Sequence, residues 1–139
     1  MPVTVKILTP LKLVVVDCSG VVTDNDWLDT FSRLWANPAF DRSSDKLIDT
    51  RRVERFEVKS ATIFRLGAEA RKVYEGQPKS KTAVVAPLPE IHGVARQHQL
   101  ITEGIAPETQ VFWTYEDACA WLGRNPENPP PPAAEDRRK

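Results

Sequence analysis

Residues 14–24 read VVVDCSGVVTD, an apolar run that ends at Asp17 and is followed by Gly20, Thr23 and Asp24. Three consecutive valines are typical of a strand in the interior of a sheet, where both faces are covered. We expect Gly20 to break this strand, because glycine tolerates turns, and Thr23 or Asp24 to cap a helix. The stretch therefore predicts a buried strand that leads directly into a helix.

The rest of the chain alternates between apolar runs and patterns with helical spacing. The expected strands are residues 3–9, 11–18, 46–50, 82–88 and 109–113, and the expected helices are residues 24–37, 60–74, 89–103 and 115–122. Residues 51–59 are expected to form a charged connection. Strands that alternate with helices of this length need crossover connections, which make neighbouring strands parallel. The order ββαβαβαβα therefore predicts a single-domain α/β fold, with a mostly parallel sheet of about five strands and one antiparallel strand at its N-terminal edge.

The composition limits the classes of function. The chain has 139 residues, which is enough for one domain and too few for two. Nineteen basic and nineteen acidic residues give a formal net charge of zero, which removes any bulk attraction to nucleic acid or an anionic membrane. No segment approaches the ~20 apolar residues of a membrane span, and the N-terminus does not resemble a signal peptide. We expect a cytoplasmic protein that binds no nucleic acid.

The C-terminal segment differs in composition from the rest of the chain. Residues 125–139 read NPENPPPPAAEDRRK, with no apolar side chain larger than alanine. This composition predicts a domain over residues 1–124 and a disordered, proline-rich tail over residues 125–139. The four consecutive prolines would suit an SH3-like groove, and the alternative is an inert, solubilising end.

The cysteines and histidines do not have the spacing of a metal site. Cys18 and Cys119 belong to no CxxC pattern and are expected to be free, buried thiols. His92 and His98 are six residues apart, which separates them by ~120° around a helix axis. We expect no metal site and no cofactor.

Asp17 raises the question of phosphoryl transfer. A strand that ends in Asp, followed by Ser-Gly and Val-Val-Thr-Asp, resembles the first motif of haloacid-dehalogenase-type phosphotransferases, whose Asp takes the phosphoryl group. Such an enzyme also needs a Lys and Mg²⁺-binding carboxylates after later strands. The sequence offers no second carboxylate pair, and Ser19 stands where most of these phosphatases carry a second Asp. A phosphotransferase that uses Asp17 is therefore the less favoured alternative.

Segments spread over most of residues 11–123 resemble one family. They are SGVVT at 19–23 with the following Trp27 and Leu28, ANPAFDRSSDKLIDTRRV at 36–53, VVAPLPEIHGVARQHQL at 84–100 and VFWTYEDACAWLG at 111–123. On these segments the chain resembles the SpoIIAA-like family of small bacterial proteins, which is related in fold to STAS domains and to CRAL-TRIO lipid-binding domains. The resemblance implies a non-enzymatic binding or regulatory module, often dimeric, that acts through protein–protein interaction. The alternative is a binder of a lipid or another small apolar or anionic ligand.

The resemblance also implies a candidate phosphorylation site. STAS-type anti-anti-sigma factors are phosphorylated on a Ser in a loop before a helix, and the corresponding stretch here is FEVKSAT at 56–62. Ser60 is the nearest match, although the Asp and Gly of that motif are absent. A phosphate at a helix N-terminus would be stabilised by the helix dipole. The alternative is that Ser60 is a plain N-cap residue.

A binding site is expected beyond the carboxyl ends of the parallel strands. That rule gathers Asp49, Thr50, Arg51, Ser60, Glu90, His92 and Thr114 at one end of the domain. Together with Arg96 of the following helix, they give five candidate binding residues: Asp49, Arg51, Ser60, His92 and Arg96. His92 and Arg96 lie one turn apart on the polar face of the expected helix, where they would suit an anionic ligand or an acidic partner. The alternative is a solvated helix face. The same spacing places His98 on the apolar face as a core histidine.

The first expected helix has an aromatic face that needs a cover. Trp27 and Trp35 both belong to that face, and either the sheet or a second copy of the chain would bury them. We therefore expect a homodimer. A regulatory protein partner predicts a flat, polar end face, an apolar ligand predicts a cavity between helix and sheet, and an enzyme predicts a cleft with titratable groups.

Overall fold

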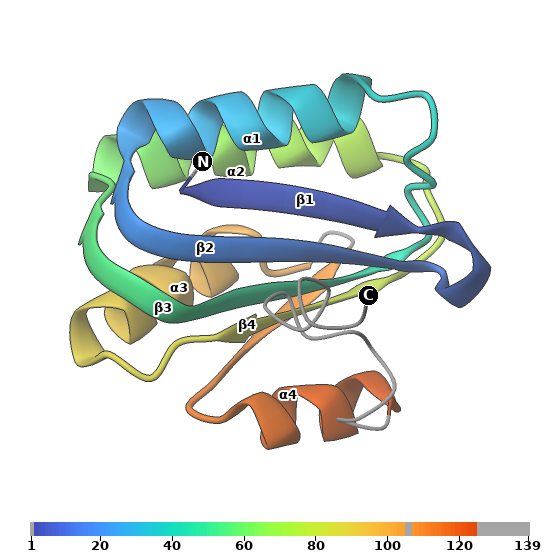
Figure 1. Ribbon diagram of the computed structural model, residues 1–139. Coiled ribbons are helices and arrows are strands. Elements are labelled where there is room, and N and C mark those ends of the chain that lie inside the picture. Colours follow the sequence, from blue (N-terminus) through green and yellow to red (C-terminus); the bar gives the residue numbers. More distant parts are fainter. Residues whose placement is uncertain (1, 105–106, 125–139) are drawn as a thin grey trace.

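The computed structural model describes residues 2–104 and 107–124, which form a five-stranded sheet with helices on both faces (Figure 1). The strands are β1 (Val3–Leu8), β2 (Leu13–Thr23), β3 (Asp45–Glu57), β4 (Lys81–Val85) and β5 (Glu108–Phe112). The helices are α1 (Asp24–Ala36), α2 (Ser60–Tyr74), α3 (Pro89–Ile101) and α4 (Tyr115–Leu122), and a 3-10 turn, η1 (Thr9–Leu11), joins β1 to β2.

The predicted fold class is confirmed. The strands lie in the order β1-β2-β3-β4-β5, with β1 antiparallel to β2 and all other neighbours parallel. The expected tail at 125–139 lies outside the described residues. None of the described helices is both long enough and apolar enough to cross a membrane.

The sheet separates two apolar layers, because successive residues of a strand point to opposite faces. On one face Val14 and Val16 of β2 pack with residues from α1, α2 and α3. On the other face Leu13 and Val15 pack with α4. Figure 1 shows α1 and α2 above the sheet and α4 below it. Most of the core therefore lies between the sheet and three helices.

Strands β2 and β3 are longer than the sequence predicts. Gly20 does not end β2, which continues to Thr23 through register shifts at Asp17/Ser19 and Gly20/Val21. Gly20 has φ +66°, a conformation that glycine adopts at little cost, so it allows this irregularity inside a paired strand. Residues 51–57, expected to form a connection, pair with β2 as the second half of β3. Their charged side chains face solvent, whereas Val53 is buried.

Helix α1 is capped by Thr23, one of the two caps that the sequence predicts, and Asp26 completes a capping box. The Thr23 hydroxyl accepts the Asp26 N–H at 3.3 Å, and the Asp26 carboxylate accepts the Thr23 N–H at 2.9 Å. The helix ends at Ala36, just before Pro38, which restricts the residue that precedes it.

A residue at the start of α1 binds the start of helix α2. Its N-cap is Lys59, whereas Ser60, the expected cap, is the first helical residue. Asp24 Oδ1 accepts the Lys59 N–H at 2.8 Å and the Thr62 hydroxyl at 2.6 Å. The Thr62 hydroxyl and the Lys59 N–H both stabilise the carboxylate and lower the pKa of Asp24. Asp24 therefore ties the start of α2 to the start of α1.

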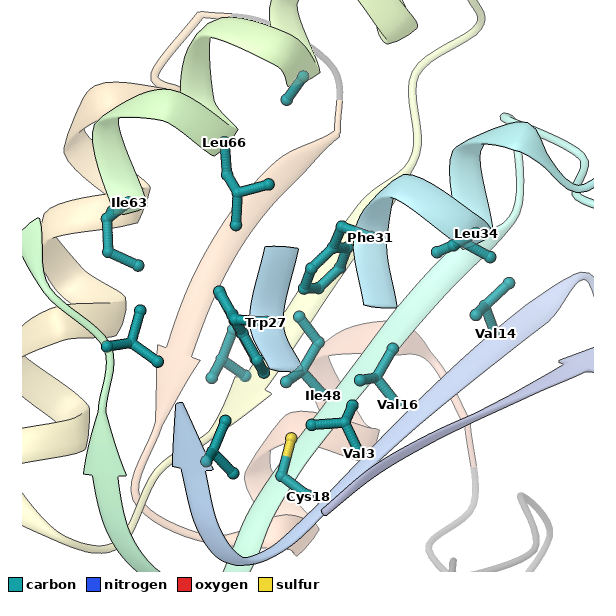
Figure 2. Packing of buried hydrophobic residues seen from close by; sticks show 14 of the residues in the cluster. Val3, Val14, Val16, Cys18, Trp27, Phe31, Leu34, Ile48, Ile63 and Leu66 are labelled. Carbon is teal, nitrogen blue, oxygen red and sulfur yellow. The ribbon is translucent and has the colours of Figure 1, made fainter. Parts of the chain in front are cut away.

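The aromatic face of α1 is covered by the chain's own sheet. Trp27 is buried and makes edge-to-face contacts with Phe31 at 5.0 Å and with Phe56 of β3 at 5.3 Å between ring centroids. Figure 2 shows Trp27 and Phe31 pointing from the helix toward Val16 and Ile48 on the strands. The burial of Trp27 does not require a second copy of the chain.

We expect Asp24→Ala to lower the free energy of unfolding by about 1 kcal/mol, the usual effect of losing a helix cap, because the Lys59 N–H and the Thr62 hydroxyl lose their acceptor. Urea unfolding followed by circular dichroism measures this change. The matched control is Asp29→Ala, which removes an exposed ion pair with Arg33 on the same helix and should change stability much less. Equal effects of the two substitutions would contradict a stabilising role for the Asp24 hydrogen bonds.

Candidate functional site

Asp49 and Arg51 bind each other. Arg51 Nη2 lies 2.8 Å from Asp49 Oδ2, and Arg51 Nε lies 3.0 Å from Asp49 Oδ1. The guanidinium also lies over the ring of Tyr115, 4.1 Å from its centroid, on the α4 side of the sheet. The carboxylate holds the pKa of Arg51 above its usual value, mainly through these hydrogen bonds. The pair is a structural contact between β3 and the start of α4.

His92 is buried, whereas the sequence predicts it on an exposed polar face. Its Nδ1 lies 3.0 Å from the carbonyl oxygen of Ala86, so Nδ1 carries the proton, because a carbonyl oxygen only accepts. Its ring stacks on Trp113, with centroids 3.4 Å apart and planes 5° apart. The first turn of α3 packs back against the ends of β4 and β5, and helical spacing alone does not reveal this contact.

The remaining two predicted residues, Ser60 and Arg96, lie on α2 and α3. Ser60 is exposed in the first turn of α2, and its hydroxyl donates to Gln97 of α3 at 3.3 Å. Arg96 is exposed on α3. The five predicted residues therefore do not converge on one site. Phosphorylation of Ser60 and ligand binding by Arg96 stay predictions.

The Asp17 carboxylate is largely buried and pairs with an arginine of the neighbouring strand. It lies within β2, in register with Asp49 of β3, and one oxygen pairs with the guanidinium of Arg52. The other oxygen, Oδ1, is buried. Burial raises the pKa of Asp17 even though the Arg52 charge lowers it. Within residues 2–104 and 107–124, no cluster of three or more His, Cys, Asp or Glu side chains has the arrangement of a metal site.

A cavity lies between the sheet and helices α1, α2 and α3. The space in which the centre of a water molecule fits amounts to about 70 Å³. Its walls are mainly aromatic and aliphatic, and they include Trp27, Phe31 and Trp35 of α1, Leu66 of α2, and Ile48 and Val84 of the sheet. A cavity between helix and sheet is the feature that we expect of a protein that binds an apolar ligand.

One end of the cavity is polar. Lys46, Thr82 and Thr109 are successive register partners on β3, β4 and β5, and all three line the cavity. Lys46 is only 4% exposed, and its Nζ donates to the Tyr74 hydroxyl at 2.5 Å. The Thr82 hydroxyl is buried and has no hydrogen-bond partner within the described part of the chain. We call Lys46, Thr82 and Thr109 the polar row.

The sequence contained a signal for the polar row. Strand alternation places Lys46 on the same face as Ile48, two residues further along, and therefore on the core side. The adjacency of Lys46 to Thr82 and Thr109 depends on strand order and register, which a single sequence does not fix.

His98 lines the cavity, as expected for the apolar face of α3. Burial lowers the pKa of His98 to about 4, and the positive charge of Lys46 contributes in the same direction. His98 is therefore a neutral imidazole near pH 7. The cavity combines an apolar wall with one ammonium group and one uncharged histidine.

The chain is similar to solved structures along most of its length, and two of them carry the comparison. One is an uncharacterized protein of the DUF3478 family with a SpoIIAA-like fold from Shewanella loihica PV-4, with a TM-score of 0.55 and 16% identity over 86% of this chain and 91% of that one. This chain has a SpoIIAA-like fold. The second is the anti-sigma factor antagonist SpoIIAA in its unphosphorylated form, with a TM-score of 0.52 and 12% identity over 87% of this chain and 97% of that one. No protein-family model and no curated protein matches the chain.

We expect this SpoIIAA-like domain to lose stability as the pH falls from 6.5 toward 4, partly through His98. The unfolded chain binds a proton at the ordinary pKa of 6.5, whereas the folded chain binds it only near pH 4. Protonation therefore favours unfolding in this range, by up to about 3 kcal/mol from this group. Urea unfolding of the wild type and of His98→Leu at pH 6.5, 5.5 and 4.5 should show a flatter pH dependence for the variant. Parallel pH profiles would contradict this prediction.

Proposed function

We propose that this chain is a binding module whose cavity takes a small apolar molecule. The observation that carries the proposal is the cavity itself, which lies between three helices and the sheet and has walls made largely of aromatic and aliphatic side chains. Ligand sites are typically concave and apolar, with a few polar groups that orient the ligand. The SpoIIAA-like fold is compatible with this role, since we also expect a binding or regulatory module from the sequence.

The size of the cavity restricts the ligand. A single water needs about 10–15 Å³ by this measure, so 70 Å³ holds several waters or a group of a few carbon atoms. Sites for drug-sized ligands are commonly about 300–1,000 Å³. A complete phospholipid would require the helices to separate, whereas a short alkyl chain or a single ring would not.

A wider surface pocket borders the cavity beside the polar row. Thr102 and Thr109 line both the cavity and a wider surface pocket of about 580 Å³, which is also bordered by Lys79, Ser80 and Gln99. The two spaces therefore adjoin at these threonines. A small ligand would reach the apolar walls by passing the ends of β4 and β5.

We expect 1-hexanol to bind the wild-type protein and to change the fluorescence of Trp27 and Trp35, which line the cavity. Ala95→Leu places extra carbon atoms in the cavity and should weaken binding at least tenfold. The matched control is Ala68→Leu on the exposed side of α2, which should bind like the wild type. Fluorescence titration measures the affinities, and circular dichroism checks the fold. Equal binding by Ala95→Leu and the wild type would place the ligand elsewhere.

A second candidate function, protein–protein interaction, is favoured by the surface beside His92. Trp113 is 55% exposed, yet its ring is held in place by stacking on His92. Leu88, 37% exposed, follows the neighbouring strand β4 at the same edge of the sheet. Exposed and pre-ordered tryptophans are typical of interaction surfaces. The partner that we propose is a second copy of this chain. The proposed homodimer would form through the surface around Trp113, and not through the aromatic face of α1.

We expect Trp113→Ala to weaken self-association, because the anchoring ring is removed. Sedimentation velocity from about 1 to 100 μM should show a dimer for the wild type and a monomer for the variant. Phe64→Ala is the matched control, since Phe64 is also 55% exposed but lies on α2. A wild type that stays monomeric over the whole range would exclude the homodimer.

A further inference from the structure

We propose that the ligand of the cavity carries a carboxylate, which pairs with the ammonium of Lys46. This inference rests on the proposed function, because it identifies the chemical class of the ligand for the same cavity. It predicts a short-chain aliphatic or an aromatic carboxylic acid in its ionised form. Lys46 and Thr82 would hold the head of the ligand, and the walls from α1, α2 and α3 would cover its apolar part.

The first argument is that Lys46 is buried and that, among the described residues, no carboxylate pairs with it. An ammonium has three donors, and the Tyr74 hydroxyl accepts one of them. The ammonium also lies over the rings of Tyr74, at 4.6 Å from the centroid, and Phe40, at 5.7 Å. No Asp or Glu in residues 2–104 and 107–124 forms an ion pair with it. Buried charges are normally paired, so the remaining donors are available to an anion.

The second argument is that another unused donor lies beside Lys46. Thr82 is its register partner, and adjacent strands are about 4.8 Å apart, so the two side chains are neighbours on the same face. The Thr82 hydroxyl has no partner within the described ranges. A carboxylate has two oxygens that accept hydrogen bonds, one from the ammonium and one from the hydroxyl. Both donors line the cavity.

The third argument distinguishes a carboxylate from a phosphate. A phosphate monoester carries about −1.5 to −2 charges near pH 7, whereas a carboxylate carries one. Lys46 supplies one positive charge, and His98, the other titratable base on the wall, is neutral near pH 7. The small volume also favours the smaller, planar group. A single ammonium in an apolar cavity therefore matches a monoanion.

The test compares hexanoate with 1-hexanol, which has the same chain length and no charge. Isothermal titration calorimetry and tryptophan fluorescence should show that the wild type binds hexanoate at least tenfold more tightly than 1-hexanol at pH 7. Lys46→Met keeps an unbranched side chain, one atom shorter, and removes its charge, so this variant should lose the preference for hexanoate over 1-hexanol. Lys81→Met is the control, because Lys81 lies on neighbouring β4 but over Trp121.

The outcomes separate this inference from the proposed function. If the folded wild type binds neither probe, the proposed function fails. If it binds both probes equally, or if Lys46→Met keeps the preference, the cavity binds ligands but the role of Lys46 is overturned. If Lys46→Met does not fold, isotope-filtered nuclear Overhauser effects on the wild type test the inference. Contacts from the hexanoate C2 protons to the Thr82 methyl and the Tyr74 ring support it. Contacts from the C6 methyl to these two groups instead overturn it.

Discussion

The parallel pairing of β2 with β3 is the constraint on which the rest of the structure depends. Ten register pairs join the two strands, from Leu13↔Asp45 to Thr23↔Glu57. Because the strands are parallel and end together, α1 and α2 start at the same edge of the sheet and run back across the same face. Their return places Trp35 and Tyr74 over the beginning of β3, where Lys46 lies. The cavity is the space that remains between these helices and the strands beneath them.

Much of the fold follows from the sequence, and the exceptions have physical causes. The valine run, the capping residues of α1 and the alternation of strands with helices all report local interactions, and each is found where it is expected. The second half of β3 does not follow from the sequence pattern, because a charged stretch indicates a solvent-exposed connection. Here, however, β3 pairs with β2 alone, so most of its side chains face solvent although the segment is a strand. Among residues 51–55 only Val53 is buried.

The candidate site was less predictable than the fold. The five residues chosen from the carboxyl ends of the strands lie on different faces, because Asp49 and Arg51 point toward α4 while His92 packs under Trp113. The rule for open sheets selects an edge and does not say which groups already bind one another. Lys46 lies at the opposite end of β3, where this rule does not look for a site. Its importance depends on what surrounds it, since a lysine is unusual only once it is known to be buried.

The link made by Asp24 has a mechanical consequence for the cavity. It joins the N-terminal ends of α1 and α2, 35 residues apart in sequence, above the carboxyl edge of the sheet. At the opposite ends of the two helices, the rings of Trp35 and Tyr74 make an edge-to-face contact, with 6.5 Å between centroids. The two helices are therefore joined by hydrogen bonds at Asp24 and by a ring contact above Lys46. A ligand longer than the cavity would separate the helices at their C-terminal ends, above Lys46, while the Asp24 link keeps their N-terminal ends together.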